Sequence, residues 1–440
     1  MRHVPSAAIA ALVLAGGAAA HADPGKPVAV RFWGRGLVTI ETYWDLRIAV
    51  DPYALRIGYD DPQIDADLVL VTHEHFDHNN VGLIGGAPRV LRGLDDAGDV
   101  VALDVVLDRM PDSPTVALFD ASEPVTRSDH AVRVRSIGAF HDAEDGSQRG
   151  RTAMFLIEVD GVRILHSGDL GQPALSRAQL RAIGSVDVLL LPVGGVYTID
   201  GPQAVRITGQ VQPRIVIPIH YRTEAQSLKL DGAEAFLEAL PQRYERVTST
   251  GNTLAVTAGL GPTRDAPRVV MLQTRPAAMP PEIAALLAAK ESAAADSREV
   301  FMALSKTQMN HRPGNGTHTP RWNAEHMMGM ELRFFTAVYA AMDPSVGIVN
   351  LAPAQMPDEY TAAHPGWTGA EEARQIDRVQ KLTRRFAYLL RELDLDERPP
   401  GSPWSLHEFL RQMQRHYVEH TDNVRKKFEL PDWPPRSPER

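Results

Sequence analysis

The chain has 440 residues, of which 44% are hydrophobic and 23% charged, so it can bury a sizeable core and wholesale disorder is excluded. Its 46 Lys and Arg residues against 55 Asp and Glu residues give a net charge of −9, which argues against a sequence-independent grip on nucleic acid. Cysteine is absent, so disulfides, thiolate zinc sites and cysteine nucleophiles are excluded, and a metal would have to be held by His, Asp or Glu.

Residues 1–22 have the parts of a secretory signal peptide. Arg2 supplies a positive charge, Ala7 to Ala20 are small or apolar, and Ala20-His21-Ala22 fits an A-x-A cleavage site. The run is too short to span a bilayer core of about 30 Å. We therefore expect cleavage, a periplasmic or secreted mature chain and no stable membrane insertion. The alternatives are an uncleaved anchor and a buried N-terminal helix.

Residues 23–275 form a strand-rich region. Short apolar runs, many of them bounded by Gly, Asp or Pro, are typical of strands. They are Val28–Trp33, Leu37–Glu41, Ile48–Asp51, Leu68–Thr72, Val132–Ile137, Ala153–Val159, Val162–His166, Val186–Leu191, Ile215–Ile219 and Thr253–Val256. Asp160-Gly161 predicts a tight hairpin turn, and Pro173–Ile183 and Ala233–Leu240 are predicted helices. The mixture indicates sheets with helices packed outside.

Residues 276–440 have a helical pattern instead. The predicted helices are Pro281–Thr307, Trp322–Met342, Glu371–Leu393 and Ser405–Phe428. Ser405 and Glu408 have the spacing of a capping box at the start of the last helix. Four helices with polar, Pro- and Gly-rich connections predict a four-helix bundle, joined to the first region near Arg275–Pro281.

Residues 71–78, VTHEHFDH, contain four metal-ligand residue types. His73 and His75 alternate at the end of a predicted strand, so both imidazoles point to one side, and Asp77 and His78 follow as the chain turns away. Imidazole and carboxylate together suit zinc, iron or manganese. A polar surface turn rich in His is the alternative, and further candidates argue against it.

Those further candidates are His141, Asp169 and His220, each of which lies at or just beyond the end of a predicted strand. Loops at strand ends are where a rigid scaffold displays chemistry. Taken singly, each of these residues could instead be a capping Asp or a hydrogen-bonded His. Together with the first cluster they complete two ligand sets.

The sequence that carries these candidate ligands resembles the metallo-β-lactamase fold superfamily. It is most similar to the branch of zinc-dependent hydrolases that includes ascorbate-phosphate lactonase-like proteins. The matching stretches within residues 32–221 are WGRGLVTIE, AVDPY, VTHEHFDH, GAFHD, DGVRILHSGDLG, LLLPVGGVYTIDGPQA and IPIHY. The resemblance implies an αββα sandwich. It also implies two ligand sets, His73, His75 and His141 for one metal, and Asp77, His78 and His220 for the other, with Asp169 bridging.

The implied chemistry is hydrolysis by a hydroxide that bridges two divalent metals, which we expect to be zinc, with manganese or iron as alternatives. Asp77 and His78 are the candidate catalytic residues. Relatives often have His after the Gly of the first strand motif, where this chain has Arg35, and we expect that departure to affect substrate contacts more than metal binding. The candidate substrate contacts are Arg35, Tyr197, Thr198 and Tyr221, and the loop Asp142–Arg151 is a candidate flank of the substrate or else a solvated hairpin.

The second region resembles the DinB/YfiT-like four-helix bundles through residues 304–334 and 406–428. His416 and His420 are four residues apart and share a face of the last helix. Members of that family often hold one divalent metal with three His. The third ligand usually lies eight residues after a Trp, where this chain has Met330, so His326, one turn earlier, is the substitute candidate. The bundle is expected to be either a metal site, as in thiol transferases, or a packing partner.

The sequence therefore predicts an exported two-domain metal-dependent hydrolase. Its substrate would be a small molecule with an ester, lactone, amide or phosphodiester bond. A metal-dependent oxidoreductase on the same fold, of the sulfur dioxygenase or diiron type, is the first alternative. A non-catalytic metal-binding protein is the second. Metal identity and O₂ uptake would discriminate between the hydrolase and the oxidoreductase.

Overall fold

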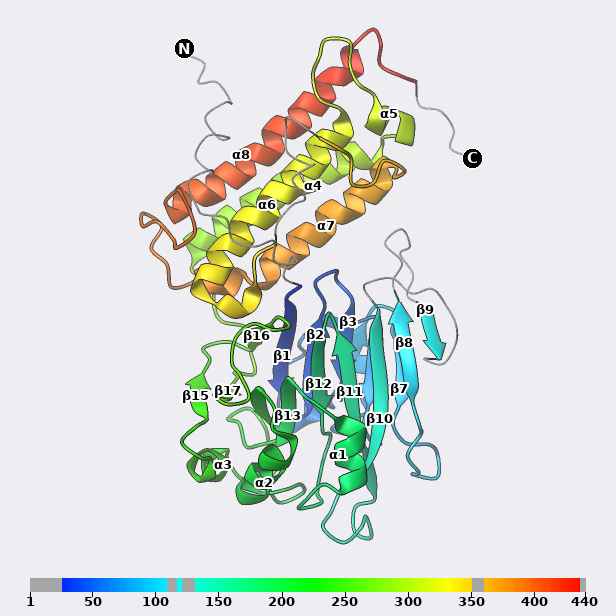
Figure 1. The fold of residues 1–440 in the computed structure, drawn as a ribbon, viewed down its shortest axis with the longest axis vertical. Coiled ribbons are helices and arrows are strands. Elements are labelled where there is room, and N and C mark those ends of the chain that lie inside the picture. Colours follow the sequence, from blue (N-terminus) through cyan, green and yellow to red (C-terminus); the bar gives the residue numbers. More distant parts are fainter. Residues whose placement is uncertain (1–25, 109–116, 121–130, 350–359, 436–440) are drawn as a thin grey trace.

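The computed structural model describes residues 26–108, 117–120, 131–349 and 360–435. The predicted signal peptide lies outside these ranges and stays a prediction. Figure 1 shows the strands gathered in one half of the molecule and the long helices in the other. None of the helices in the described ranges combines the length and apolar character needed to cross a membrane.

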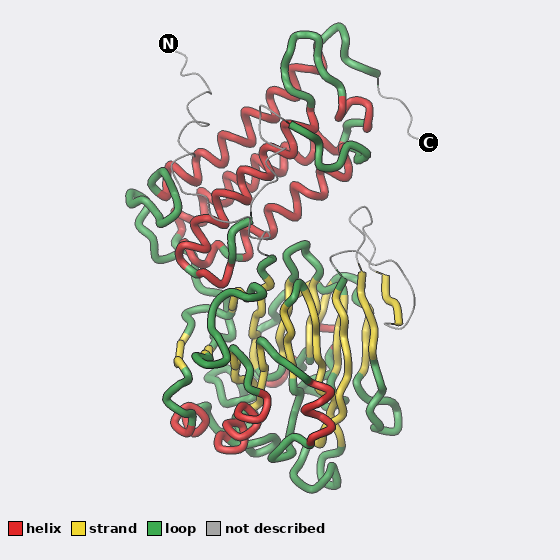
Figure 2. The backbone as a smooth tube through the Cα atoms, viewed as in Figure 1, coloured by secondary structure: helices red, strands yellow, loops and turns green. Residues whose placement is uncertain are grey.

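Two large mixed sheets form the strand-rich half (Figure 2). The first has the order β16 (Thr253–Val256), β1 (Val28–Gly34), β2 (Leu37–Glu41), β3 (Arg47–Val50), β5 (Leu68–Val71) and β7 (Arg89–Arg92). The second has the order β15 (Glu245–Thr248), β17 (Arg268–Met271), β14 (Ile215–Ile219), β13 (Val188–Pro192), β12 (Val162–His166), β11 (Arg151–Val159), β10 (Val132–Phe140), β8 (Asp104–Asp108) and β9 (Ala117–Asp120). A small third sheet pairs β4 (Ile64–Asp65) with β6 (Ile84–Gly85).

The core lies between the two large sheets, because alternate side chains of each strand point to opposite faces. In β5, Leu68 and Leu70 join the core that the two sheets share, whereas Val69 and Val71 pack on the outer face. That outer face is covered by the 3-10 turns at Leu55–Ile57 and Val81–Leu83 and the loops around them. The α-helices α1 (Arg177–Ile183), α2 (Gly201–Val211) and α3 (Glu234–Ala239) follow strands of the second sheet.

Parallel pairing places several strand ends at one edge of the sandwich. β12, β13 and β14 are parallel to one another, as are β3 and β5. β10 and β12 are both antiparallel to β11, so they run in the same direction. Within each sheet, the loops that follow these strands therefore lie at the same edge. These loops carry the predicted ligands.

The predicted strands are present with bounds shifted by at most a few residues, and Val159 pairs with Val162 around the Asp160-Gly161 turn. The sequence missed α2, whose start is marked by a capping box between Asp200 and Gln203. It also missed β7, β8, β15 and β17. β7 and β15 are largely exposed, so they lack the apolar run that signals a strand.

The second half is a bundle of α4 (Pro281–Met302), α6 (Pro320–Met342), α7 (Gly369–Arg385) and α8 (Leu406–Arg425), with the short α5 (Lys306–Asn310). Two predicted helices were too long. The first ends at Met302 because Ser305 caps α5, and the third ends at Arg385, before a 3-10 turn at Ala387–Leu390.

The predicted capping box of α8 is half correct. The Ser405 side chain accepts a hydrogen bond from the backbone nitrogen of Glu408, at 3.3 Å. The reciprocal bond is not among those that cap this helix, because the Glu408 carboxylate turns toward Arg415, 3.5 Å away.

The bundle joins the sandwich through buried contacts on β1, β2 and β16. Ala29 and Ala255 belong to the same apolar cluster as residues of the helices. Arg385 of α7, 4% exposed, reaches the end of β2, where its Nε lies 2.8 Å from Glu41 Oε2 and its Nη1 donates to the Thr42 carbonyl. Its Nη2 lies 3.4 Å from Asp45 Oδ1. A charge-assisted clamp thus fixes the two halves.

We predict that Arg385→Ala lowers the free energy of unfolding by about 2–3 kcal/mol, because it leaves buried acceptors without their donor. Arg384→Ala is the matched control, since the Arg384 side chain is 49% exposed and such surface changes stay within about 0.5 kcal/mol. Urea unfolding of both variants tests this. Equal losses in the two would contradict the clamp.

Candidate metal centres

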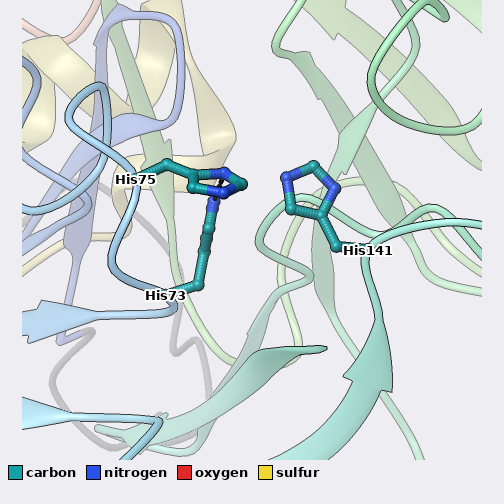
Figure 3. Close-up of side chains that lie close together, drawn as sticks. All are labelled: His73, His75 and His141. Atoms are coloured by element: carbon teal, nitrogen blue, oxygen red, sulfur yellow. Dashed lines mark hydrogen bonds between the residues drawn. The ribbon is translucent and has the colours of Figure 1, made fainter. Parts of the chain in front are cut away.

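The first three predicted ligands meet at the edge of the sandwich. His73 and His75 follow β5 and His141 follows β10, and their ligand atoms all lie within 4.8 Å of one another (Figure 3). The turn after β5 is held by hydrogen bonds from the backbone nitrogens of His78 and Asn79 to the His75 carbonyl, at 2.9 and 3.1 Å. His73 and His141 are buried whereas His75 is exposed, so the group is open to solvent on the His75 side.

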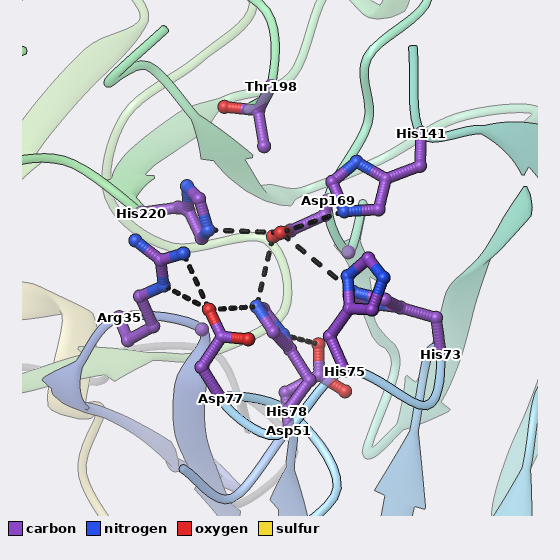
Figure 4. A network of polar contacts seen from close by, with 12 residues as sticks. Arg35, Asp51, His73, His75, Asp77, His78, His141, Asp169, Thr198 and His220 are labelled. Carbon is purple, nitrogen blue, oxygen red and sulfur yellow. Dashed lines mark hydrogen bonds and ion pairs between the residues drawn. The ribbon is translucent and has the colours of Figure 1, made fainter. Parts of the chain in front are cut away.

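A second group, Asp77, His78 and His220, lies beside the first, with ligand atoms also within 4.8 Å of one another. Asp169 lies between the two groups (Figure 4). Its Oδ2 is 3.0 Å from His220 Nε2 and 3.3 Å from His141 Nε2, and its Oδ1 is 3.2 Å from His78 Nε2. The structure therefore brings together all seven residues that the sequence proposed as ligands.

The facing atoms are suited to bind cations. His78 Nε2, His220 Nε2 and Asp169 Oδ1 are buried and have no hydrogen-bond partner among the described residues. Buried polar atoms without partners destabilise a fold by about 1–3 kcal/mol each unless a ligand satisfies them. Imidazole nitrogens that converge on one buried carboxylate fit divalent metal ions of the zinc type.

The electrostatics keep His73, His220 and Asp169 in their ligand forms, whereas Asp169 and Asp51 overcome the effect of burial and hold the pKa of His78 well above its usual range. Burial and the neighbouring His78 hold the pKa of His73 well below its usual range. Burial lowers the pKa of His220 to about 4. Burial alone would raise the pKa of Asp169, but His220 and His78 beside it hold that pKa far below its usual range. The result is a charged carboxylate among mostly neutral imidazoles, and neutral imidazole is the form that binds metal.

Asp51 is a site residue to which sequence reasoning gave no role. Its Oδ2 accepts from His78 Nδ1 at 2.9 Å and from Thr72 Oγ1 at 2.7 Å, and its Oδ1 accepts from the Thr72 backbone nitrogen at 2.7 Å. Because an ionised carboxylate only accepts, His78 donates from Nδ1 and leaves Nε2 free to bind a metal. Its position directly after a buried strand, in AVDPY, was the available signal.

Arg35 contacts one of the predicted metal ligands. Its Nε donates to Asp77 Oδ2 at 2.8 Å and its Nη2 lies 2.5 Å from the same oxygen. Its backbone carbonyl accepts from the His220 backbone nitrogen at 2.9 Å. Arg35 is only 3% exposed, and its expected contact with substrate stays a prediction.

The other candidate substrate contacts fall into two classes. The Tyr197 ring lies between the guanidinium groups of Arg35 and Arg149, at 5.9 and 5.8 Å from its centroid. Thr198 lies above the ligand network in Figure 4, and no dashed contact reaches it. Tyr221 does not join the site, because it is 9% exposed and its hydroxyl points to the Leu272 carbonyl at 3.5 Å.

The loop Asp142–Arg151 is held in place rather than freely solvated. The Asp142 carboxylate accepts from four backbone nitrogens of the loop, those of Glu144, Gly146, Gln148 and Arg149. Arg149 in turn donates to the Val196 carbonyl at 3.3 Å. The loop is thereby tied to the segment that carries Tyr197 and Thr198, beside the ligand His141.

The bundle brings its three predicted ligands together as well. His326 of α6 and His416 and His420 of α8 place their ligand atoms within 4.8 Å of one another. His420 Nδ1 lies 2.8 Å from Asn323 Oδ1, which orients that ring. Met330, at the position where the family usually has its His, is buried in the bundle at 5% exposure.

Burial lowers the pKa of each of these three imidazoles, to about 4 for His326, about 3 for His416 and about 2 for His420. They are therefore neutral at ordinary pH. His311 and His318 lie outside the group, and the exposed His318 stacks on Trp322 with ring centroids 3.8 Å apart.

Each half of the chain matches the model of a known family. Residues 29–220 match the family model of the beta-lactamase superfamily domain, and residues 289–422 match that of the DinB superfamily. These matches confirm the two resemblances drawn from the sequence.

Curated relatives cover the first half. A UPF0173 metal-dependent hydrolase of Thermococcus onnurineus is 30% identical over 200 residues, which are 44% of this chain and 85% of that protein. One of Cupriavidus necator is 32% identical over 251 residues, 49% of this chain and 82% of that protein. A protein of the metallo-beta-lactamase superfamily from Thermotoga maritima, known from a crystal structure, is 26% identical to this chain. Its alignment has a TM-score of 0.39 and covers 56% of this chain and 100% of that one.

We predict that Asp51→Asn weakens metal binding at the first cluster about 10–100-fold, because the one amide oxygen cannot accept from both the Thr72 nitrogen and His78 Nδ1, and the tautomer of His78 is then no longer fixed. Asn is chosen because Asp51 has a φ of 53°, a conformation that Asn tolerates. Competition with a chelator of known affinity measures the change. Asp96→Asn, at an exposed position, should leave the affinity unaltered, and an equally unaltered Asp51→Asn would contradict the role.

Proposed function

The chain belongs to the UPF0173 family of metal-dependent hydrolases, and from this premise we propose that it uses a dinuclear zinc centre to cleave an ester, lactone, amide or phosphodiester bond in a small molecule. The observation that carries the proposal is the arrangement of two groups of three ligands around one carboxylate, Asp169. If only one metal ion were bound, the buried nitrogens of one of the two groups would have no ion to coordinate.

Each group has a distinct part in this proposal. His73, His75 and His141 would hold one ion, and Asp77, His78 and His220 the other, with Asp169 shared between them. Bound zinc would supply a water with a pKa near 7 and would polarise the bond that is cleaved. Zinc is favoured because it takes His and carboxylate ligands in sites that keep an open position.

The residues of the chain orient the reaction. Burial opposes ionisation of Asp77, but His78 and Arg35 hold its pKa below the usual range, so Asp77 can accept a hydrogen bond from the attacking water. Arg35 fixes that carboxylate in one orientation. The open side at His75 is the entrance that we propose for the substrate.

The proposed centre lies at the edge of the sandwich away from the bundle. The β1–β2 hairpin places Arg35 at the ligand cluster, whereas the other end of β2, Glu41, meets Arg385 of the bundle. The bundle therefore contributes no described side chain to this cluster. We place the enzyme outside the cytoplasm on the sequence of residues 1–22 alone.

We expect His75→Ala to abolish hydrolysis and to remove about one zinc per chain, because the exposed group loses one of its three protein ligands. Glu74→Ala is the matched control, since Glu74 is the exposed neighbour that pairs with Arg92 instead. Elemental analysis of the full chain and a screen of esters, lactones, amides and phosphodiesters measure both effects. Bound iron with O₂ uptake would instead favour the oxidoreductase alternative.

A third metal ion, bound in the bundle, is favoured by His326, His416 and His420. Their three ligand atoms converge, and His326 Nδ1 is buried without a hydrogen-bond partner among the described residues. We propose that they hold one divalent ion by three imidazoles, with a further coordination position left for a ligand.

His416→Ala should therefore remove about one metal per chain and leave hydrolysis at the first centre unchanged, because the two clusters share no residue. Glu419→Ala, at an exposed position on the same helix, should keep the full metal content. Elemental analysis measures the metal content of both variants, and the hydrolysis assay measures the activity of the first centre. An unchanged metal content in His416→Ala would leave the bundle as a packing partner.

A further inference from the structure

A cavity of about 310 Å³ opens beside the imidazole cluster of the bundle. It lies where α8 ends and α6 begins, at the end of the bundle away from the sandwich (Figure 1). Trp322 and Asn323 of α6 form one wall, and Asn423, Lys426 and Lys427 form another. Neither the proposed hydrolase chemistry nor the three imidazoles make use of this space.

The cavity carries positive charge without a counter-ion. Lys426 and Lys427 line it, and among its described lining residues none is Asp or Glu. Lys427 is 3% exposed, and its Nζ donates to a neutral partner, Thr317 Oγ1, at 3.1 Å. A buried ammonium group without a carboxylate destabilises a fold, so its presence calls for an explanation.

The pKa shifts of Lys427 and His318 are consistent with positive charge in the cavity that no carboxylate neutralises. Burial and then the adjacent Lys426 lower the pKa of Lys427. Burial and then Lys427 and Arg312 lower the pKa of His318, which also lines the cavity. A lysine can instead stabilise a helix C-terminus by binding its last carbonyls, but the bond from Lys427 goes to a threonine hydroxyl of a loop.

The cavity and the imidazole cluster share a wall. The Trp322 ring is stacked between His318 and His326, with centroids 3.8 and 4.5 Å apart, and its buried indole nitrogen has no hydrogen-bond partner among the described residues. Asn323, next along α6, lies 2.8 Å from His420 Nδ1. A molecule in the cavity would therefore contact the lysines and the Trp322 side of this wall, with the imidazole cluster behind it.

We propose that this cavity binds the oxyanion group, a carboxylate or a phosphate, of a small molecule. Lys427 is the principal contact, because it is the buried cation. Lys426 adds charge at the rim, and Asn423, which also lines the space, offers a further donor in its amide. The binding site stands whether or not a metal occupies the imidazole cluster.

The test uses the full chain with two probes, inorganic phosphate and malonate. Hydrogen exchange read by mass spectrometry should show protection of residues 313–318 and 423–430 on addition of at least one probe. Calorimetry should show that Lys427→Met weakens the binding of that probe about 10-fold or more. Protection by malonate alone identifies a carboxylate ligand, and protection by phosphate alone identifies a phosphate ester.

Arg411→Met is the matched control, because Arg411 is an exposed cation on the same helix and its loss should leave the affinity unchanged. Lys427→Met should also raise the melting temperature, whereas a lysine kept only to cap the helix would lower it when replaced. Absence of protection in both segments with both probes, or equal affinities of the wild-type chain and Lys427→Met, would overturn the proposal. The hydrogen-exchange measurement uses only the wild-type chain, so it tests the proposal even if Lys427→Met fails to fold.

Discussion

The buried carboxylate of Asp169 is the interaction on which the strand-rich half depends. It contacts His73 and His78 from the first sheet, and His141 and His220 from the second, so one charged group ties the two layers together at their common edge. A carboxylate at 2% exposure is tolerable only with positive or metal-bound partners on every side. The parallel strands around it supply those partners, because their ends meet at one edge.

A similar logic appears in the bundle with different geometry. On a helix, residues four apart lie one turn apart on the same face, so His416 and His420 project together and His326 completes the group from a neighbouring helix. The bundle core also holds an ion pair, Lys290 with Glu331, at 1% exposure for each side chain. Lys427 beside the cavity and Glu325 on α6 instead bind neutral groups, a threonine hydroxyl in one case and a tyrosine hydroxyl and backbone nitrogens in the other.

The two proposed centres are separated by the clamp that joins the halves. Arg385 binds Glu41 and Asp45 at the end of β2 opposite the hairpin that carries Arg35. A substrate at one centre therefore does not touch the other, and each half can have its own ligand. The buried Arg385 clamp restrains how the two halves are oriented.

The sequence by itself determined the residue types and spacings: H-x-H-x-D-H after an apolar run, Asp and His after further strands, and His-x3-His on a helix. These patterns are local, and strand or helix periodicity decides on which side such residues point. Only the tertiary structure decided the roles of Asp51, Arg35 and Tyr221, because each depends on a partner from a distant part of the chain. The strands β7 and β15 and the early end of the third long helix were missed for the same reason, since sheet pairing and packing between helices override weak local patterns. The pairing of Lys427 with a threonine, 110 residues away along the chain, is likewise a product of packing that no periodicity reveals.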